Sequence, residues 1–97
     1  MITHTVLITW NDNLPDGQLR LITRELAALP GLVPSLRSYR FGPNVGPAAT
    51  NQQFAVVATF DDLAGWTEYD THPEHVRVKT EHMVPYIESR AVIQIES

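Results

Sequence analysis

The order in which two hydrophobic periods follow one another constrains the fold of this chain more than any other feature. From Ile2 to Trp10, apolar side chains recur in steps of two, which is typical of a strand with one buried face. The next segment changes to steps of three and four, and four aliphatic residues form one stripe: Leu19, Ile22, Leu26 and Leu29. That spacing predicts an amphipathic helix, and Pro15 is expected at its first position.

Three later segments repeat the strand signal. They are rich in β-branched and aromatic residues, and we predict strands at Ser35–Phe41, Phe54–Phe60 and Ala91–Glu96. The segment Gly42–Gln52 holds two prolines, two glycines and two asparagines, so it is predicted to be a loop.

Two short helices are predicted between the third and fourth strands. Asp61 and Asp62 are suited to cap the first, which would present three residues on one face: Leu63, Trp66 and Tyr69. Pro73 is expected to open the second helix, whose inward face would carry two residues seven positions apart: Val76 and Met83.

The resulting order, β-α-β-β-α(α)-β, is the split βαβ pattern of the ferredoxin-like architecture. We therefore expect one α+β domain over residues 1–97, with a four-stranded antiparallel sheet covered by helices on one face. The uncovered face would carry side chains too apolar to leave in water: Thr5, Leu7, Thr9, Val57 and Val92. This surface predicts a homodimer that forms through the two sheet faces.

Composition excludes several classes of function. The chain has 7 basic and 11 acidic residues, and its scattered cations do not form the basic patch that nucleic acid needs. It has no cysteine, which excludes disulfides and thiolate chemistry. The first apolar run is too short to span a membrane and lacks a basic segment before it. We therefore expect a cytoplasmic protein that binds neither nucleic acid nor membrane.

Four stretches of the sequence carry a family resemblance. They are the opening M-I-x-H-x-V-L-I-x-W, the segment A-L-P-G-L-V-P, the segment S-Y-x-x-G-P-N and the block F-D-D-L-A-G-W-x-E-Y-x-x-H-P-E-H-x-x-V. In this order they cover nearly the whole chain, which resembles the stress-responsive A/B barrel (Dabb) family. The resemblance implies a dimeric α/β barrel. It also implies a likeness to cofactor-free polyketide cyclases of the plant olivetolic acid cyclase type, which perform an aldol condensation with a histidine and a tyrosine.

Carried over by motif, the resemblance implies that His75 is the catalytic base, Tyr69 its partner and His4 the histidine of the first strand. A further histidine of the plant enzyme has no counterpart here, where Phe54 stands near its place. A neutral imidazole can remove a proton next to a carbonyl, and a phenol can donate a hydrogen bond to the enolate. The block around Pro73 can equally serve only as a helix junction.

His4 lies on an otherwise apolar strand face, where an ionisable group must find a hydrogen-bond partner or lose its charge. It can be a core histidine bonded to the backbone, or it can stand at the end of a pocket. The pocket between sheet and helices is expected to be lined by apolar side chains: Val6, Ile22, Leu26, Phe54, Val78 and Tyr86.

No cofactor and no metal are expected, since neither H-x-x-x-H nor H-E-x-x-H occurs. The first hypothesis for function is a cofactor-independent cyclase or isomerase that acts on a β-keto or polyketide-like substrate. The alternative is a stress-response protein without catalysis, or one that binds a small hydrophobic ligand. A monooxygenase-like reaction on an electron-rich aromatic substrate also stays open.

Overall fold

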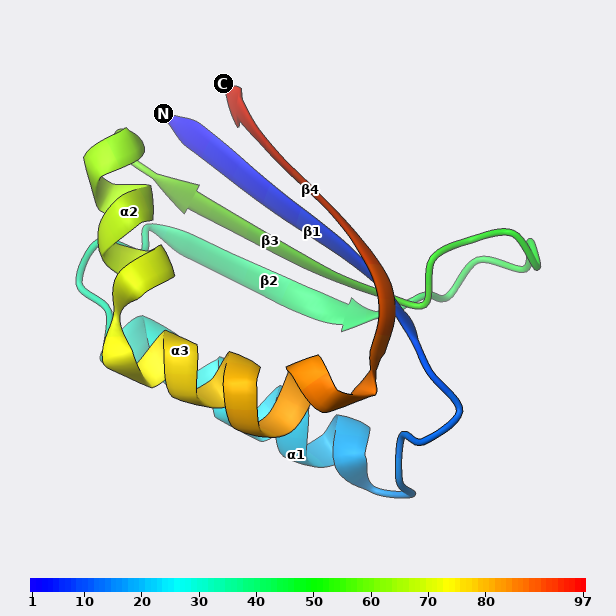
Figure 1. Cartoon of the computed structure of the whole chain (residues 1–97). Helices are drawn as coiled ribbons and strands as arrows, with labels where there is room; N and C mark the ends of the chain where they lie inside the picture. Colours follow the sequence, from blue (N-terminus) through cyan, green and yellow to red (C-terminus); the bar gives the residue numbers. More distant parts are fainter.

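The fold is built around one antiparallel sheet. The structure is a computed structural model that describes all 97 residues. Its four strands are β1 (Ile2–Trp10), β2 (Ser38–Pro43), β3 (Phe54–Phe60) and β4 (Ile87–Glu96). They are arranged in the order β2-β3-β1-β4, so β1 is hydrogen-bonded to a strand on each side (Figure 1). The pairs run from Ile2 opposite Phe60 to Ile8 opposite Phe54, and from Ile2 opposite Glu96 to Trp10 opposite Ile87.

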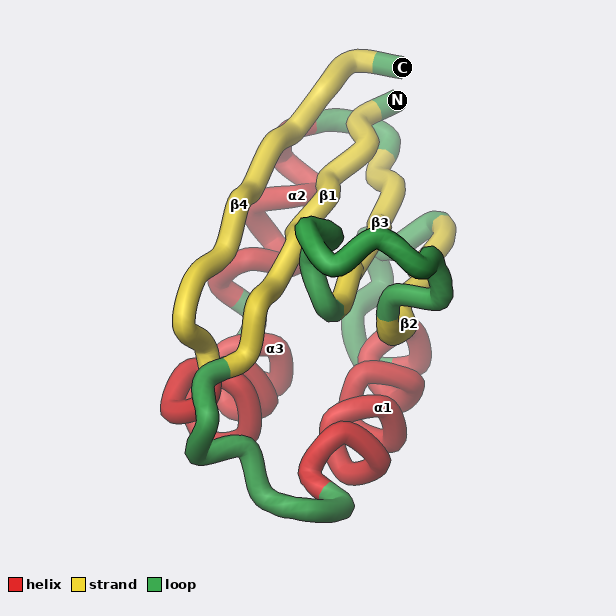
Figure 2. Tube along the Cα trace, turned by 90° about the vertical axis from the view of Figure 1, so that its right-hand side faces the viewer, coloured by secondary structure: helices red, strands yellow, loops and turns green.

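All helices lie on one side of this sheet (Figures 1 and 2). They are α1 (Gln18–Ala28), α2 (Leu63–Thr71) and α3 (Pro73–Val78), with a short 3-10 turn η1 (Leu29–Gly31) after α1. A π-helical turn η2 (Lys79–Met83) and a 3-10 turn η3 (Val84–Tyr86) continue α3 toward β4. This element order confirms the predicted ferredoxin-like α+β class. No helix has both the length and the apolar composition to cross a bilayer.

The core lies between the sheet and the helices. In β3 every second residue is buried, and Phe54, Val56, Ala58 and Phe60 are at most 3% exposed. Ile22, Leu26 and Leu29 of the first helical segment are at most 2% exposed. The predicted apolar faces of the strands and of the first helix therefore pack against each other. Each fully buried aliphatic or aromatic side chain stabilises the folded state by about 1.5–3 kcal/mol.

Three elements start at other residues than predicted, and β2 also ends two residues late, at Pro43, so that the predicted loop from Gly42 is shorter. The first helix begins at Gln18 instead of Pro15, because Gly17 adopts a left-handed conformation with φ 82. The second strand begins at Ser38, since the Leu36 amide still donates to the Val33 carbonyl in a turn. The fourth strand begins four residues early, at Ile87, because its pairing with β1 continues to Ser89 and, across a bulge between Thr9 and Trp10, to Ile87.

One residue of the inward face of the last helical segment was predicted wrongly. Val76 is 39% exposed, whereas Val78 and Met83 are 1% and 6% exposed. Val78 and Met83 are five residues apart, and the π-helical turn that follows Val78 places residues at that spacing on one face. The seven-residue α-helical spacing that paired Val76 with Met83 therefore misplaced Val76, whereas Val78 and Met83 face inward as expected. In α2, Leu63 is 58% exposed and is not part of the core either.

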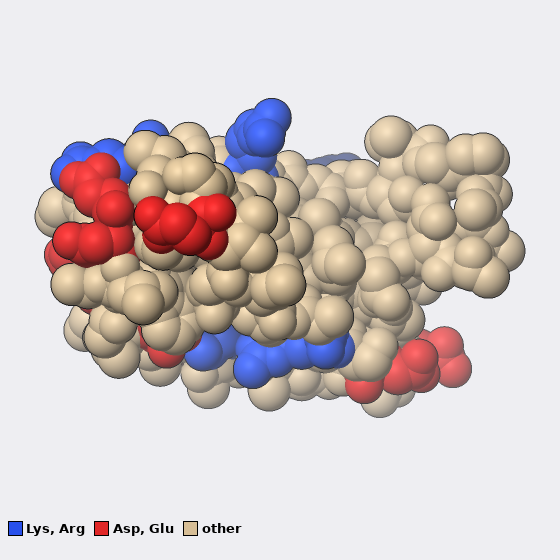
Figure 3. Space-filling model, turned by 90° about the horizontal axis from the view of Figure 1, so that it is seen from above, with Lys and Arg blue, Asp and Glu red and all other residues tan.

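The outer face of the sheet is open and largely uncharged. Leu7, Ile93 and Ile95 lie on this face, with 37%, 58% and 50% of their surface exposed. Val92 was expected there, but it is paired with Val6 and faces the helices, since directly paired residues point to the same side. Seen from above in Figure 3, the side opposite α1 and α3 shows few charged side chains away from its ends and edges.

Candidate functional site

A cavity of about 410 Å³ lies between the sheet and the helices. All four strands, the three helices and the η2 turn contribute to its 16 lining residues, 10 of which are hydrophobic. Its size and mostly apolar wall are typical of a site for a small organic molecule. The polar groups in the wall are few, and they come from α2, α3, η2 and the strands: His4, Tyr39, Tyr69, Asp70, His75, Lys79, Arg90 and Gln94.

The junction between α2 and α3 brings Tyr69 and His75 together. The chain bends at His72, whose Nδ1 accepts a hydrogen bond of 3.1 Å from the Glu74 amide and so caps α3. The bend stacks the ring of His75 on that of Tyr69, with a centroid distance of 4.0 Å and an interplanar angle of 31°. The block around Pro73 is therefore a helix junction, and it also directs one imidazole into the cavity.

The hydrogen bond of His75 defines its neutral tautomer. Its Nδ1 lies 3.3 Å from the carbonyl oxygen of Asp70, and a carbonyl can only accept. Nδ1 therefore carries the proton, and the lone pair of Nε2 stays available. Burial is the main cause that lowers the pKa of His75, and it outweighs the opposing effect of the Asp70 carbonyl. The ring is thus neutral at neutral pH and able to accept a proton.

His4 is held in the complementary state. This side chain is 6% exposed, and its Nδ1 lies 2.7 Å from Nε2 of Gln94 on β4. The amide nitrogen donates, so Nδ1 accepts and the ring proton is on Nε2. Burial also lowers the pKa of His4, and Arg90 lowers it further, against the effect of Asp70. The cavity therefore holds two neutral imidazoles, one with a free lone pair and one with an N–H to donate.

Two phenols form a further pair. The hydroxyl oxygens of Tyr39 and Tyr69 are 2.9 Å apart, so one donates to the other and one O–H remains for a ligand. Burial raises the pKa of Tyr39 to about 12. Burial raises the pKa of Tyr69 as well, and the neighbouring Tyr39 adds to this effect. Both phenols are consequently protonated donors at neutral pH. The indole N–H of Trp66, another cavity residue, has no partner in the protein.

The structure brings together only part of the site expected from sequence. His4, Tyr69 and His75 line the cavity, and so do Val6 and Leu26. The other four expected lining residues do not: Ile22, Phe54 and Val78 are at most 2% exposed in the core, and half-buried Tyr86 packs against it.

Sequence reasoning missed the polar residues on β4. Arg90 and Gln94 lie on the same face of β4 as Val92, opposite Ile8 and His4 of β1. Their alternation with Ala91, Ile93 and Ile95 is visible in the sequence, but the register with β1 is needed to tell which set faces the helices.

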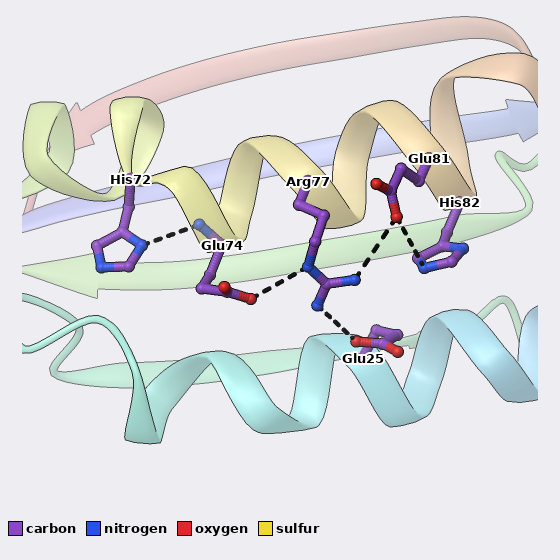
Figure 4. A network of polar contacts seen from close by, with 6 residues as sticks. All are labelled: Glu25, His72, Glu74, Arg77, Glu81 and His82. Atoms are coloured by element: carbon purple, nitrogen blue, oxygen red, sulfur yellow. Dashed lines mark hydrogen bonds and ion pairs between the residues drawn. The ribbon is translucent and has the colours of Figure 1, made fainter.

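A polar network outside the cavity includes three glutamates and the two histidines that do not line the cavity (Figure 4). Arg77 of α3 contacts Glu25 of α1 at 3.0 Å, Glu74 at 3.2 Å and Glu81 at 3.7 Å, and thereby ties the two helices together. No three His, Asp or Glu side chains are grouped in a way that could hold a metal ion.

Three comparisons place the chain among known proteins. The model of the stress responsive A/B barrel domain (Dabb) matches residues 2–97. No curated protein matches the sequence. A dimeric ferredoxin-like protein of unknown function from Thermobifida fusca is 34% identical, with a TM-score of 0.91 over 99% of this chain and 90% of that one.

Two further solved structures are similar. A dimeric protein of unknown function with a ferredoxin-like fold from Bacteroides fragilis is 28% identical, with a TM-score of 0.82 over 99% of this chain and 95% of that one. A hydroxynitrile lyase from Passiflora edulis shares the fold at 20% identity, with a TM-score of 0.83 over 97% of this chain and 90% of that one. The family model spans nearly the whole sequence, and the chain therefore belongs to the stress-responsive A/B barrel (Dabb) family.

Proposed function

We propose that this protein is a cofactor-independent enzyme that removes a proton next to a carbonyl group of a small β-keto or polyketide-like substrate. The observation that carries the proposal is the pair of neutral imidazoles in one cavity, His75 with a free Nε2 lone pair and His4 with an Nε2 proton. A hydroxynitrile lyase has the same fold, so this fold is compatible with lyase chemistry.

In the proposed reaction, Nε2 of His75 takes the proton from the carbon between two carbonyl groups. The negative charge moves to the carbonyl oxygen, where the Nε2 proton of His4 and the free hydroxyl proton of the Tyr39–Tyr69 pair stabilise it. The enolate carbon then attacks a second carbonyl of the same molecule, and the new alkoxide takes back the proton from His75. The protons balance within the site, and no cofactor is needed.

The test of this proposal is deuterium exchange at the acidic carbon of the acetoacetyl thioester of N-acetylcysteamine, followed by NMR. Replacing His75 by Gln should slow the exchange by about 100-fold or more, as is common for loss of a positioned base. His82→Gln is the matched control, since His82 does not line the cavity. Equal exchange by the His75→Gln variant and wild type would refute the assigned base.

A non-catalytic role is the second candidate, because most of the cavity wall is apolar. A protein of this kind would hold a small hydrophobic ligand without changing it. The two candidates separate in one experiment, since a binding protein gives saturable changes in Trp66 fluorescence but no deuterium exchange above background.

A homodimer through the sheet faces is part of the proposal. The outer face carries exposed Leu7, Ile93 and Ile95, which water alone would cover in a monomer. The similar proteins from Thermobifida fusca and Bacteroides fragilis are both described as dimeric. Pairing two such faces would bury these side chains and leave the cavity, on the other side of the sheet, unobstructed.

A further inference from the structure

We propose that the substrate of this cavity carries a carboxylate, which Lys79 and Arg90 bind at the cavity mouth; the inference rests on the function proposed above and names the class of its substrate. The two cations come from different elements, Lys79 from η2 and Arg90 from β4, and both line the cavity. Both also line a shallower depression of about 380 Å³ on the surface. They therefore stand where the cavity opens to the outside.

Neither cation is paired within the protein. Arg37 and Arg77 form ion pairs of 2.7 and 3.0 Å, whereas no carboxylate lies within ion-pair distance of Lys79 or Arg90. Two acidic residues are in the neighbourhood, Asp70 in the cavity and Glu88 in the outer depression. Acidic residues outnumber basic ones in this chain, 11 to 7, and still no carboxylate of the protein pairs with these two cations. The opening can therefore bind an anionic group of a ligand.

The positions of the cations fit the reacting groups. Arg90 lowers the pKa of His4, and Lys79 lowers that of His75, so the field of each cation reaches one of the two imidazoles. An anion bound between them would hold the rest of the molecule over both rings. It would also offset the two positive charges, which raises the proton affinity of His75 when the substrate is in place.

A carboxylate suits this opening better than a phosphate. A guanidinium binds either group through two parallel hydrogen bonds, and Lys79 can add a third, so the charge of the anion decides between them. The Asp70 carboxylate in the same cavity would repel a doubly charged phosphate more strongly than a singly charged group. Figure 3 shows basic side chains at the middle of its lower edge, where β4 and α3 lie in Figures 1 and 2, with acidic side chains on both sides of them.

The test compares two unreactive probes of equal length, octanoate and octanamide, by isothermal titration calorimetry. Wild type should bind octanoate about tenfold more tightly than octanamide, the usual size of a charge-assisted hydrogen bond. Arg90→Gln and Lys79→Gln should each lose most of this preference while octanamide binding stays unchanged. Arg20→Gln removes an exposed cation that does not line the cavity and should behave as wild type.

Equal affinities of wild type for the two probes would overturn the proposal, and so would equal losses in Arg90→Gln and Arg20→Gln. Retained octanamide binding shows that a variant is folded. The probes do not react, so this result is independent of catalysis. Normal deuterium exchange of the uncharged thioester without any preference for octanoate overturns the carboxylate site alone. A clear preference without exchange supports the carboxylate site and overturns the proposed base.

Discussion

The hydrogen bond between Gln94 and His4 offers the sharpest test of the electrostatics of the cavity. It is 2.7 Å long, and Gln94 donates to a buried ring whose pKa burial holds below its ordinary value. Replacing Gln94 by Glu keeps the shape of the side chain but places a carboxylate beside Nδ1. The new partner accepts instead of donating, so it binds a protonated Nδ1 and reverses the tautomer that the wild type selects.

The size of the change follows from the short distance. A carboxylate this close to an imidazole raises its pKa by about 1 to 3 units, which corresponds to about 1.4 to 4 kcal/mol. In wild type the lowered pKa of His4 makes the folded state bind fewer protons than the unfolded state, so stability is complete above the ordinary histidine pKa and falls as the pH decreases. In Gln94→Glu the His4 contribution changes sign and favours the folded state on the acid side.

The assay has two parts. A ¹⁵N NMR titration should show His4 of wild type protonated at Nε2 and titrating below its ordinary pKa, and His4 of Gln94→Glu titrating above it. Urea unfolding at about pH 5.5 and pH 7.5 should show a smaller loss of stability on acidification in the variant. Gln52→Glu adds the same charge at an exposed position outside the cavity and is the control. If His4 titrates alike in wild type and Gln94→Glu, the inferred contact and tautomer are wrong.

Three further predictions follow from other contacts. Tyr39→Phe removes one member of the phenol pair, and its unfolding free energy should fall by about 1 kcal/mol while deuterium exchange slows; unchanged exchange would exclude a role of this pair in stabilising the enolate. Ile93→Lys places a charge on the open sheet face and should yield a monomer in light scattering, whereas Thr67→Lys on exposed α2 should not; a wild-type monomer at micromolar concentration would contradict the dimer. Arg77→Ala breaks the link between α3 and α1 and should leave the urea unfolding midpoint almost unchanged, because solvent screens these ion pairs; a large fall of the midpoint would contradict this reasoning.

The sequence predicted the fold well because most elements obey regular periods. The third strand was predicted at its observed bounds, Phe54–Phe60, since it alternates without interruption and turn residues flank it. The errors lie where the backbone departs from regularity. A left-handed glycine delays α1, a bulge carries the pairing of β4 on to Ile87, and a π-helical turn breaks the seven-residue spacing that had placed Val76 on the inward face.

The candidate site was less accessible to sequence reasoning. His4, Tyr69 and His75 came from a family resemblance, and spacing along the chain does not place them in one cavity. Gln94 and Arg90 are far from these residues in sequence, and they reach the cavity only because β4 pairs with β1 in a particular register. Register depends on contacts between distant segments, which one strand pattern does not contain.

The two histidines of the cavity, His4 and His75, belong to parts of the backbone that differ in rigidity. His4 belongs to the middle of the sheet, where backbone ladders on both flanks hold it, and its amide should be among the last to exchange with solvent. His75 belongs to a helix of six residues that follows one of nine, and the corner between them is held by a few local hydrogen bonds and by side-chain packing, not by a strand ladder on each side. Ligands of different size must therefore be accommodated by movement of the helices, while the strand wall of the cavity keeps its position.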